Sequence, residues 1–193
     1  MKKNLAKAAL VTIMASAPLV AGGFSNTTES LFALEGGYTN LNAEVSQNGY
    51  SLQKEGMGNF GLKLGAQGKN YRVFLSGRYF LAEQGNTVAT AGGEAQYKFN
   101  FSSPVDFFIG ANGGIAFMKI GPSDDGVMAS VSTNAPYIGG DVGFNYHASE
   151  LIDLELGVKY MHIDEKITQG AVTYDFNNMT TGYASIIFKY QMD

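Results

Sequence analysis

Apolar and polar side chains alternate along most of this chain with a period of two. The pattern is clearest near the C-terminus, where Ala184, Ile186, Phe188 and Tyr190 alternate with Tyr183, Ser185, Ile187 and Lys189. Successive side chains of a strand point to opposite faces of the sheet, so this stretch is predicted to be a strand. Helical periodicity is weak throughout, and recurring glycines penalise a helix by about 1 kcal/mol each.

The same alternation predicts eight strands. In the third, Tyr71, Val73 and Leu75 share one face, and Arg72 and Arg78 share the other. Each strand thus has one apolar and one polar face. This indicates an all-β fold in which one face of the sheet meets apolar surroundings and the other face meets polar surroundings. The eight segments are 31–45, 57–68, 71–84, 91–101, 106–120, 136–148, 152–168 and 179–191.

The connections between these segments alternate in length. Those at 68–70, 102–105 and 149–151 are tight turns, and the longer polar ones are 46–56, 85–90, 121–135 and 169–178. An even number of strands places both chain ends beside the tight turns and the long loops at the opposite end. Outer-membrane barrels sort short periplasmic turns from longer extracellular loops in this way. We therefore expect a closed, antiparallel, up-and-down transmembrane β-barrel.

Periodicity alone does not say which face points inward. A soluble eight-stranded barrel of lipocalin type, with its apolar face around a ligand, is the alternative. Three features favour the membrane barrel: aromatic residues near the strand ends, charges of both signs on the polar face, and an aromatic pair almost at the C-terminus. The aromatic residues near strand ends are Tyr38, Tyr71, Tyr79, Tyr97, Phe101, Tyr146, Tyr160 and Tyr190.

The N-terminus, residues 1–22, has the pattern of a cleaved signal peptide. Three lysines precede a short apolar run at 8–20, and small residues offer cleavage after Ala21 or Gly22. A membrane anchor or buried helix is the alternative, but the run is too short to span a bilayer and contains Pro18. We expect residues 23–193 to form one outer-membrane barrel domain, exported to the Gram-negative cell outer membrane.

Composition agrees with a strand-rich exported protein. The chain has 25 glycines, 11 tyrosines and 13 phenylalanines but only 4 prolines, which suits strands and turns. No other apolar run approaches the ~18 residues that a membrane helix needs. The net charge of −4 argues against nucleic acid as a partner.

In this pattern the chain resembles the small eight-stranded outer-membrane barrels, the OmpA/OmpX-like family. The resemblance covers residues 23–193 and implies outer-membrane lipid and lipopolysaccharide as surroundings. It also implies a C-terminal assembly signal, read by the barrel-assembly machinery, in which Phe188 and Tyr190 match the final pair. Ser185 stands where the family has glycine, and three residues follow Tyr190. The periplasmic domain of OmpA itself has no counterpart in this chain.

Alternation also predicts which charged side chains point into the barrel. An eight-stranded barrel is just wide enough for its side chains to fill, so acids and bases must pair across strands. They form either a solid polar core, which we favour, or an ion-pair gate in a narrow channel. The candidates are Glu35, Lys63, Arg72, Arg78, Glu94, Lys98, Asp141, Glu155, Lys159 and Lys189.

Two weaker patterns raise other chemistry. His147-x-Ser149, with Glu150 or Glu155, has the residue types of a lipid A deacylase, but the predicted topology places it at the periplasmic end. Carboxylates and a histidine at 162–165, and at 124–125, are candidates for cation binding, although a solvated loop surface explains them more simply. We expect no cofactor, no metal and no catalytic residue.

The leading functional hypothesis is a non-enzymatic, structural or surface-interaction barrel that displays four loops. The alternating residues of 121–135 suggest a protruding hairpin that can bind a host or envelope protein by strand addition, and an ordinary mobile loop is the alternative. The alternative is a narrow porin-like channel for ions or small apolar solutes, and the last is a lipid A-modifying enzyme. We expect a monomer.

Overall fold

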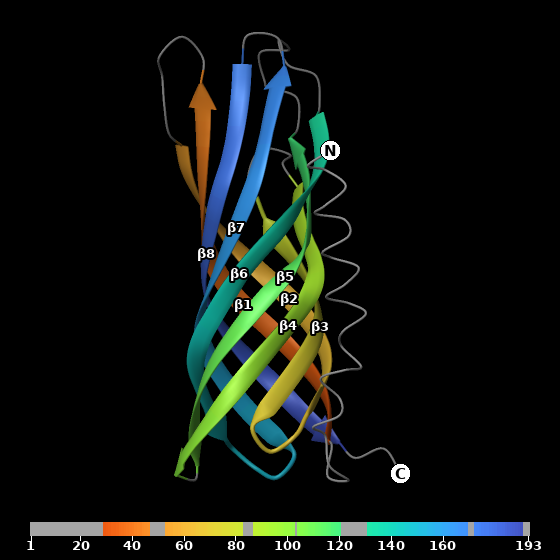
Figure 1. The fold of residues 1–193 in the computed structure, drawn as a ribbon, viewed down its shortest axis with the longest axis vertical. Helices are drawn as coiled ribbons and strands as arrows, with labels where there is room; N and C mark the ends of the chain where they lie inside the picture. Colours follow the sequence, from red (N-terminus) through yellow and green to blue (C-terminus); the bar gives the residue numbers. More distant parts are fainter. Residues whose placement is uncertain are drawn as a thin grey trace.

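The computed structural model describes residues 29–46, 53–82, 87–102, 104–120, 131–169 and 172–190, which form one closed barrel (Figure 1). Each strand pairs antiparallel with the next, and β8 closes the ring by pairing with β1. The all-β up-and-down barrel predicted from the sequence is confirmed. The predicted signal peptide, 1–22, lies outside the described residues. The strands are β1 Glu29–Ser46, β2 Gln53–Gln67, β3 Tyr71–Leu81, β4 Thr87–Ser102, β5 Val105–Ile120, β6 Val131–His147, β7 Ile152–Gln169 and β8 Val172–Tyr190.

The two ends of the barrel differ. The connections β2–β3, β4–β5 and β6–β7 lie at the end where β1 begins and β8 finishes, which we call the turn end. These turns are closed by backbone bonds such as Gly68 N to Tyr71 O at 2.8 Å and Ser149 N to Ile152 O at 3.0 Å. The other four connections lie at the opposite end, the loop end, where the strands in Figure 1 extend furthest.

The strands reach further toward the loop end than the sequence pattern predicted. β8 begins at Val172 and β7 continues to Gln169, so the predicted connection 169–178 is wrong: most of it is a paired hairpin. β2, β4 and β6 also begin four or five residues earlier than expected, at Gln53, Thr87 and Val131. Outside a bilayer neither face of a strand has to be apolar, so alternation is weak in the first residues of β2 and β4 although backbone pairing continues. The first residues of β8 do alternate, with Val172, Tyr174 and Phe176 against Thr173 and Asp175.

The wall of the barrel divides near the loop end between β6 and β7. Their pairing stops at Tyr137 and Ile163. Beyond that point β6 pairs only with β5, as far as Ile120 opposite Val131, and β7 pairs only with β8, as far as Gln169 opposite Val172. Among the side chains that the structure describes, Thr133 Oγ1 donates a hydrogen bond of 3.3 Å to Glu165 Oε1 across this division.

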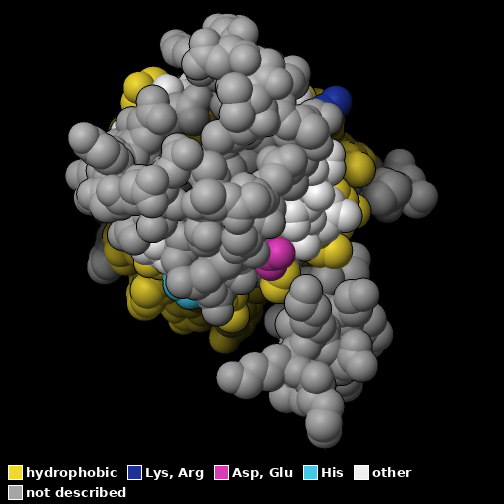
Figure 2. Space-filling view, turned by 90° about the horizontal axis from the view of Figure 1, so that it is seen from above, with side chains coloured by type: hydrophobic (Ala, Val, Ile, Leu, Met, Phe, Trp, Pro, Cys, Tyr) yellow, Lys and Arg dark blue, Asp and Glu magenta, His cyan; other side chains and the backbone are white. Residues whose placement is uncertain are grey.

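A belt of exposed apolar side chains surrounds the barrel. Figure 2, which looks onto the loop end, shows hydrophobic side chains at several points of the circumference. On β3 the outward positions run from Tyr71 to Leu81, both more than half exposed. Eleven residues rising ~3.3 Å each and tilted ~40° span about 25 Å, the height of the apolar band of outer-membrane barrels. The exposed aromatic rings are Tyr38, Phe60, Tyr71, Tyr79, Phe99, Phe117, Phe144, Tyr146, Tyr160, Phe188 and Tyr190.

Within the described ranges, no helix is long and apolar enough to cross a membrane.

Large interior side chains fill the barrel by lying against glycines of nearby strands, Tyr183 on β8 against its partner Gly157 on β7 and Tyr137 on β6 against Gly92 on β4. A Cβ at Gly157 would meet the ring of Tyr183 at 2.8 Å, and a Cβ at Gly92 would collide with the Tyr137 hydroxyl. Protein interiors are packed as densely as organic crystals, so a ring on one strand requires a missing side chain on another. The outward Gly36 and Gly182, in contrast, have open space beside them.

Candidate functional site: the barrel interior

Seven charged side chains from five strands meet in the middle of the barrel. All of them are buried, with exposed fractions of 5% or less. Each occupies an inward position of its strand, where strand alternation places it. We call them the ion-pair cluster: Glu35 on β1, Lys63 on β2, Arg72 and Arg78 on β3, Glu94 on β4, and Glu155 and Lys159 on β7.

Two glutamates share the cations at the centre of the cluster. Lys63 Nζ lies 2.5 Å from Glu35 Oε2 and 3.4 Å from Glu94 Oε2. Lys159 Nζ lies 3.0 Å from Glu94 Oε1 and 3.4 Å from Glu35 Oε2. Arg78 donates to both Glu35 and Glu94 through its guanidinium. Each buried charge therefore has several opposite partners, which offsets the cost of removing it from water.

Glu155 extends the cluster toward the turn end. Lys63 Nζ lies 3.4 Å from Glu155 Oε1, and Arg72 donates from Nη2 to Glu155 Oε2. Arg72 also donates from Nε to Gln96 Oε1 at 2.8 Å. The guanidinium of Arg72 thereby joins the cluster to the amide side chains on β4.

Aromatic rings pack against the cations. The Tyr183 ring centroid lies 4.8 Å from Lys63 Nζ and 4.7 Å from Lys159 Nζ. Arg72 lies between the rings of Phe74 and Phe108, at 5.2 Å and 5.5 Å. Rings attract cations through their negative faces, and desolvated contacts of this kind contribute about 2 kcal/mol. Salt bridges and cation–ring contacts from β1, β2, β3, β4, β5, β7 and β8 thus meet in the interior of the barrel.

The remaining predicted interior residues lie outside the cluster. Asp141 accepts from Gln96 Nε2 at 2.5 Å, and Lys98 donates to Gln67 Oε1 at 3.0 Å. Lys189 is at the turn end, where its Nζ lies 2.8 Å from Asp153 Oδ1. The structure therefore joins seven of the ten predicted charges and places these three apart.

At the turn end, His147 contacts two aspartates that the sequence pattern did not single out. His147 lies between two carboxylates: its Nδ1 is 2.8 Å from Asp153 Oδ1 and its Nε2 is 2.9 Å from Asp106 Oδ2. Asn145 Nδ2 donates to the other oxygen of Asp153 at 3.1 Å. Strand alternation could have predicted that Asp106 and Asp153 point into the barrel, where both are buried.

The weak hydrolase pattern is not assembled by this geometry. Both ring nitrogens of His147 face carboxylates on β5 and β7, and Ser149 is exposed, with its Oγ accepting from Leu151 N at 3.3 Å. Glu155 lies in the ion-pair cluster instead. His147 therefore has the contacts of a structural residue.

The interior changes character toward the loop end. Beyond the ion-pair cluster, Asn59 Nδ2 donates to Thr39 Oγ1 at 2.8 Å, and the hydroxyls of Thr39 and Thr181 are 2.7 Å apart. Beyond these polar groups the inward side chains are apolar, which the sequence analysis did not foresee. We call this layer the apolar interior: Leu41, Met57, Phe80, Val88, Ala116, Met118, Ala135, Tyr137, Met161, Ile163 and Met179.

The proposed cation-binding residues are dispersed or undescribed. His162 is exposed, with Nδ1 2.8 Å from Asn178 Oδ1. Asp124 and Asp125, and the side chain of Asp164, lie outside the part that the structure describes. Among the described side chains, no group of three or more potential ligands is placed to hold a metal ion.

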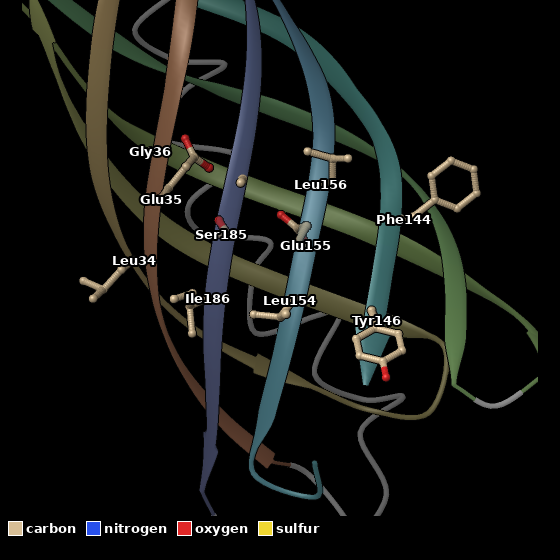
Figure 3. Close-up of a pocket in the computed structure, with 11 residues that line it drawn as sticks. Leu34, Glu35, Gly36, Phe144, Tyr146, Leu154, Glu155, Leu156, Ser185 and Ile186 are labelled. Carbon is tan, nitrogen blue, oxygen red and sulfur yellow. The ribbon is translucent and has the colours of Figure 1, made fainter. Parts of the chain in front are cut away.

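A shallow groove crosses the outer wall from β1 to β6 (Figure 3). Its volume is about 620 Å³. Leu34, Ile186, Leu154 and Phe144 line it, and Gly36 lies at its edge on β1 (Figure 3). Because these side chains belong to the apolar belt, the groove is part of the surface suited to lipid.

Phe188 and Tyr190, the predicted assembly pair, face outward at the turn end of β8. Phe188 stacks on Phe32 of β1 with ring centroids 6.1 Å apart. Both aromatic residues therefore lie at the seam where the last strand closes on the first.

A closed barrel with an apolar belt outside and paired charges inside is a transmembrane β-barrel in its construction. No family model matches the sequence, and no curated protein matches it. Solved structures do match.

One match is the Neisserial surface protein A, at 17% identity over 82% of this chain and 97% of that one, with a TM-score of 0.61. A second is the outer membrane protein OprG of Pseudomonas aeruginosa, at 13% identity over 84% and 97%, with a TM-score of 0.59. A third is OprH of the same species, at 15% identity over 84% and 99%, with a TM-score of 0.53. The chain has the fold of the small eight-stranded outer-membrane barrels, as the sequence resemblance indicated.

Proposed function

We propose that this protein is a non-enzymatic barrel of the Gram-negative outer membrane that holds β-hairpins above the cell surface for contact with other molecules. The observation that carries this proposal is the contrast between an interior crossed by the ion-pair cluster and a wall that continues beyond its apolar belt. The turn end then faces the periplasm and the loop end faces the exterior.

The largest extension is a three-stranded sheet. β7 and β8 remain paired from His162 opposite Asn178 to Gln169 opposite Val172. β1 follows β8 as far as Ser46 opposite Thr173. Hydrogen bonds between strands hold such a sheet in one shape, so a partner would meet a preformed surface and lose little affinity to ordering it.

The fold of a protein named as a surface protein supports this proposal as an analogy. The ion-pair cluster weighs against the alternative of a channel. An ion crossing this level would have to displace cations such as Lys63 that are already held by two or more glutamates. We therefore expect no single-channel steps when the protein is added to planar lipid bilayers.

The surface role is tested by trimming the hairpins one at a time. Deleting residues 165–176, which begin and end at paired positions, shortens the β7–β8 hairpin without touching the belt. Deleting 121–130 provides the matched variant on the other hairpin. Cells producing each variant are compared for adhesion to surfaces coated with extracellular-matrix proteins. Heat-modifiable electrophoretic mobility checks that the barrel still folds.

We expect one of the two deletions to abolish adhesion while the barrel remains folded. Adhesion that survives both deletions would contradict the surface role. Ion conductance by the unmodified protein would contradict the closed interior separately.

A further inference from the structure

The outer wall of the barrel is low along β8. Its outward side chains become smaller toward the loop end, where Ala184 and Gly182 precede the exposed Thr180. On β1, Gly36 is the register partner of Ala184 and Tyr38 is that of Gly182. The shallow groove of about 620 Å³ lies over β1, β6, β7 and β8, and Gly36 and Ala184 belong to its lining (Figure 3). This volume is within the range of ligand sites, about 300–1,000 Å³.

The two glycines of this wall have no packing reason inside the protein. A Cβ added at Gly36 or at Gly182 would have no atom within 4 Å, apart from those of the neighbouring residues in the chain. Larger outward side chains surround them: Tyr38, Leu156 and Val158 are each more than half exposed. A glycine inside a strand weakens it and marks a place where another molecule can approach closely. The open space therefore favours an occupant from outside the chain.

Polar side chains follow the groove on its loop-end side. Asn178 Oδ1 accepts hydrogen bonds from Tyr160 Oη at 2.6 Å and from His162 Nδ1 at 2.8 Å. Because that amide oxygen only accepts, Nδ1 carries the proton of the neutral imidazole and Nε2 remains an acceptor. Thr180 pairs in register with Tyr160 on one side and Asn40 on the other. We call these five residues the polar cap.

The chemistry of the polar cap selects among lipid headgroups. The cap supplies hydroxyl, amide and imidazole groups but no lysine or arginine, the side chains that recognise phosphate. Hydroxyl and amide groups both donate and accept, as the hydroxyls of a sugar do. Tyr160 and Tyr38 also present an apolar ring with a polar tip, which suits the boundary between membrane and water. An apolar groove followed by this cap therefore has the order of a lipid with a sugar headgroup.

We propose that the outer wall over β1, β8 and β7 binds one outer-leaflet lipid with a sugar headgroup. An acyl chain lies in the groove beside Gly36 and Gly182, and sugar hydroxyls bond to the polar cap. A rough lipopolysaccharide, lipid A with its inner-core sugars, has this chemistry. The inference rests on the proposed orientation, in which the loop end faces the exterior, and does not depend on what the hairpins bind.

Native mass spectrometry of the full chain tests this site. The barrel is refolded in detergent with equal amounts of rough lipopolysaccharide and dimyristoylphosphatidylethanolamine, and the detergent is then removed in the gas phase. We expect one lipopolysaccharide to be retained per barrel and the phospholipid to be lost with the detergent.

The groove is tested by filling it. Gly182→Leu places a side chain in the open space and should lower the fraction of barrel with bound lipopolysaccharide about tenfold, equivalent to about 1.4 kcal/mol. Gly93→Leu is the matched variant. Gly93 is an outward glycine of β4, opposite β8 in the ring of strands, and a Cβ there makes only an ordinary contact of 3.7 Å with Phe74 O. We expect this variant to retain the lipid.

The polar cap is tested by removing its central acceptor. Asn178→Ala leaves Tyr160 and His162 without their common partner and should also lower the retained lipopolysaccharide, without any gain of phospholipid. Asn134→Ala is the control, since Asn134 is an exposed, outward asparagine near the loop end of β6. Heat-modifiable electrophoretic mobility checks that every variant folds.

Retention that is lost in Gly182→Leu and Asn178→Ala, and kept in both matched variants, supports the site. Equal retention of the two lipids overturns the sugar headgroup. Absence of bound lipid, retention unaffected by Gly182→Leu, or a protein dimer in place of a lipid adduct overturns the site itself. Adhesion through the hairpins is measured separately, so either proposal can fail while the other stands.

Discussion

Glu94 lies within ion-pair distance of three cations, Lys63, Arg78 and Lys159. A buried charge with one partner is costly, and removing that partner leaves an uncompensated ion. In this cluster each acid is shared, so the loss of a single carboxylate affects cations from β2, β3 and β7 together.

We predict that Glu94→Gln lowers the free energy of unfolding by about 3–5 kcal/mol, the usual cost of breaking a buried ion pair. Urea unfolding in detergent micelles, followed by electrophoretic mobility, measures the change. The substitution preserves the shape of the side chain and removes only its charge.

A second substitution tests whether Glu94 and Lys159 stabilise the barrel as a pair. Lys159→Met removes a cation of the same cluster, so the double variant Glu94→Gln/Lys159→Met should be more stable than the sum of the single losses indicates. Strict additivity of the two losses would show that these residues do not act as a pair.

Alternation alone could predict that these charges point inward, because Arg72, Arg78 and Lys159 share their strand faces with other polar residues. It could not predict their partners. Glu35 and Lys159 are 124 positions apart and meet because the strands cross a common interior, which depends on the register of every intervening pair. Alternation gives Lys98 and Lys189 the same inward direction as the lysines of the ion-pair cluster, so the sequence could not show that these two lie outside it.

At the turn end, neighbouring strands are held together by side-chain contacts as well as by backbone hydrogen bonds. Asp106 on β5, His147 on β6, Asp153 on β7 and Lys189 on β8 form one chain of contacts. Such a chain holds four strand ends together where the backbone ladder stops.

We predict that Asp153→Ala costs about 2–3 kcal/mol of stability, because it removes bonds to His147, Lys189 and Asn145. His147 and Lys189 are partly exposed, so water screens their bonds and the combined loss stays near the value of one buried bond to a charged group, about 1.5–3 kcal/mol. The matched variant is Glu150→Ala, three residues earlier in the exposed turn, which should change stability by less than about 0.5 kcal/mol. Equal effects of both variants would indicate that the turn, and not the side-chain contacts, decides stability here. The same unfolding assay measures both.

The strands themselves were predictable only where their two faces meet different surroundings. β3 begins at Tyr71 as predicted, since its outward positions belong to the belt and its inward positions include Arg72 and Arg78, but it ends at Leu81 and not at residue 84. The first part of β8 also alternates, with Val172, Tyr174 and Phe176 against Thr173, Asp175 and Asn177, but the sequence analysis assigns it to a polar connection. Here the pattern was present in the sequence, and the prediction of a loop is wrong.

At the scale of the whole molecule, the barrel exists only once β8 has paired with β1. Phe188 and Tyr190 lie at that seam and are exposed on the lipid side. If assembly machinery reads this strand, as the family resemblance implies, then their importance exceeds their contribution to stability.

We predict that replacing Phe188 and Tyr190 with serine lowers the amount of assembled barrel in cells far more than replacing Phe144 and Tyr146 does. The second pair is also aromatic and outward at the turn end, on β6, and is at least as exposed. Both variants lose a similar transfer free energy, about 1.5–3 kcal/mol per ring.

Refolding both variants in detergent, without machinery, supplies the control: there they should behave alike. Equal assembly of the two variants in cells would contradict a signal at Phe188 and Tyr190.

The layered interior is the feature of the whole molecule that the sequence analysis missed. The polar face of β3 continues from Arg78 to Phe80, and that of β7 from Lys159 to Met161 and Ile163. Following each inward face past its last charge would have revealed the change. The change is hard to see in the sequence because, near the loop end, apolar residues occupy both the inward and the outward positions of the strands.

The packing of rings against glycines also constrains how this protein can change over generations. Because Tyr183 occupies the space beside Gly157, and Tyr137 the space beside Gly92, neither partner can grow unless the other shrinks. The first pair joins the neighbouring strands β7 and β8, and the second joins β4 to β6 past β5. In diverging copies of this gene, side-chain size at the two positions of a pair should therefore rise and fall in opposition, leaving a record of which strands lie close together even after most of the sequence has been replaced.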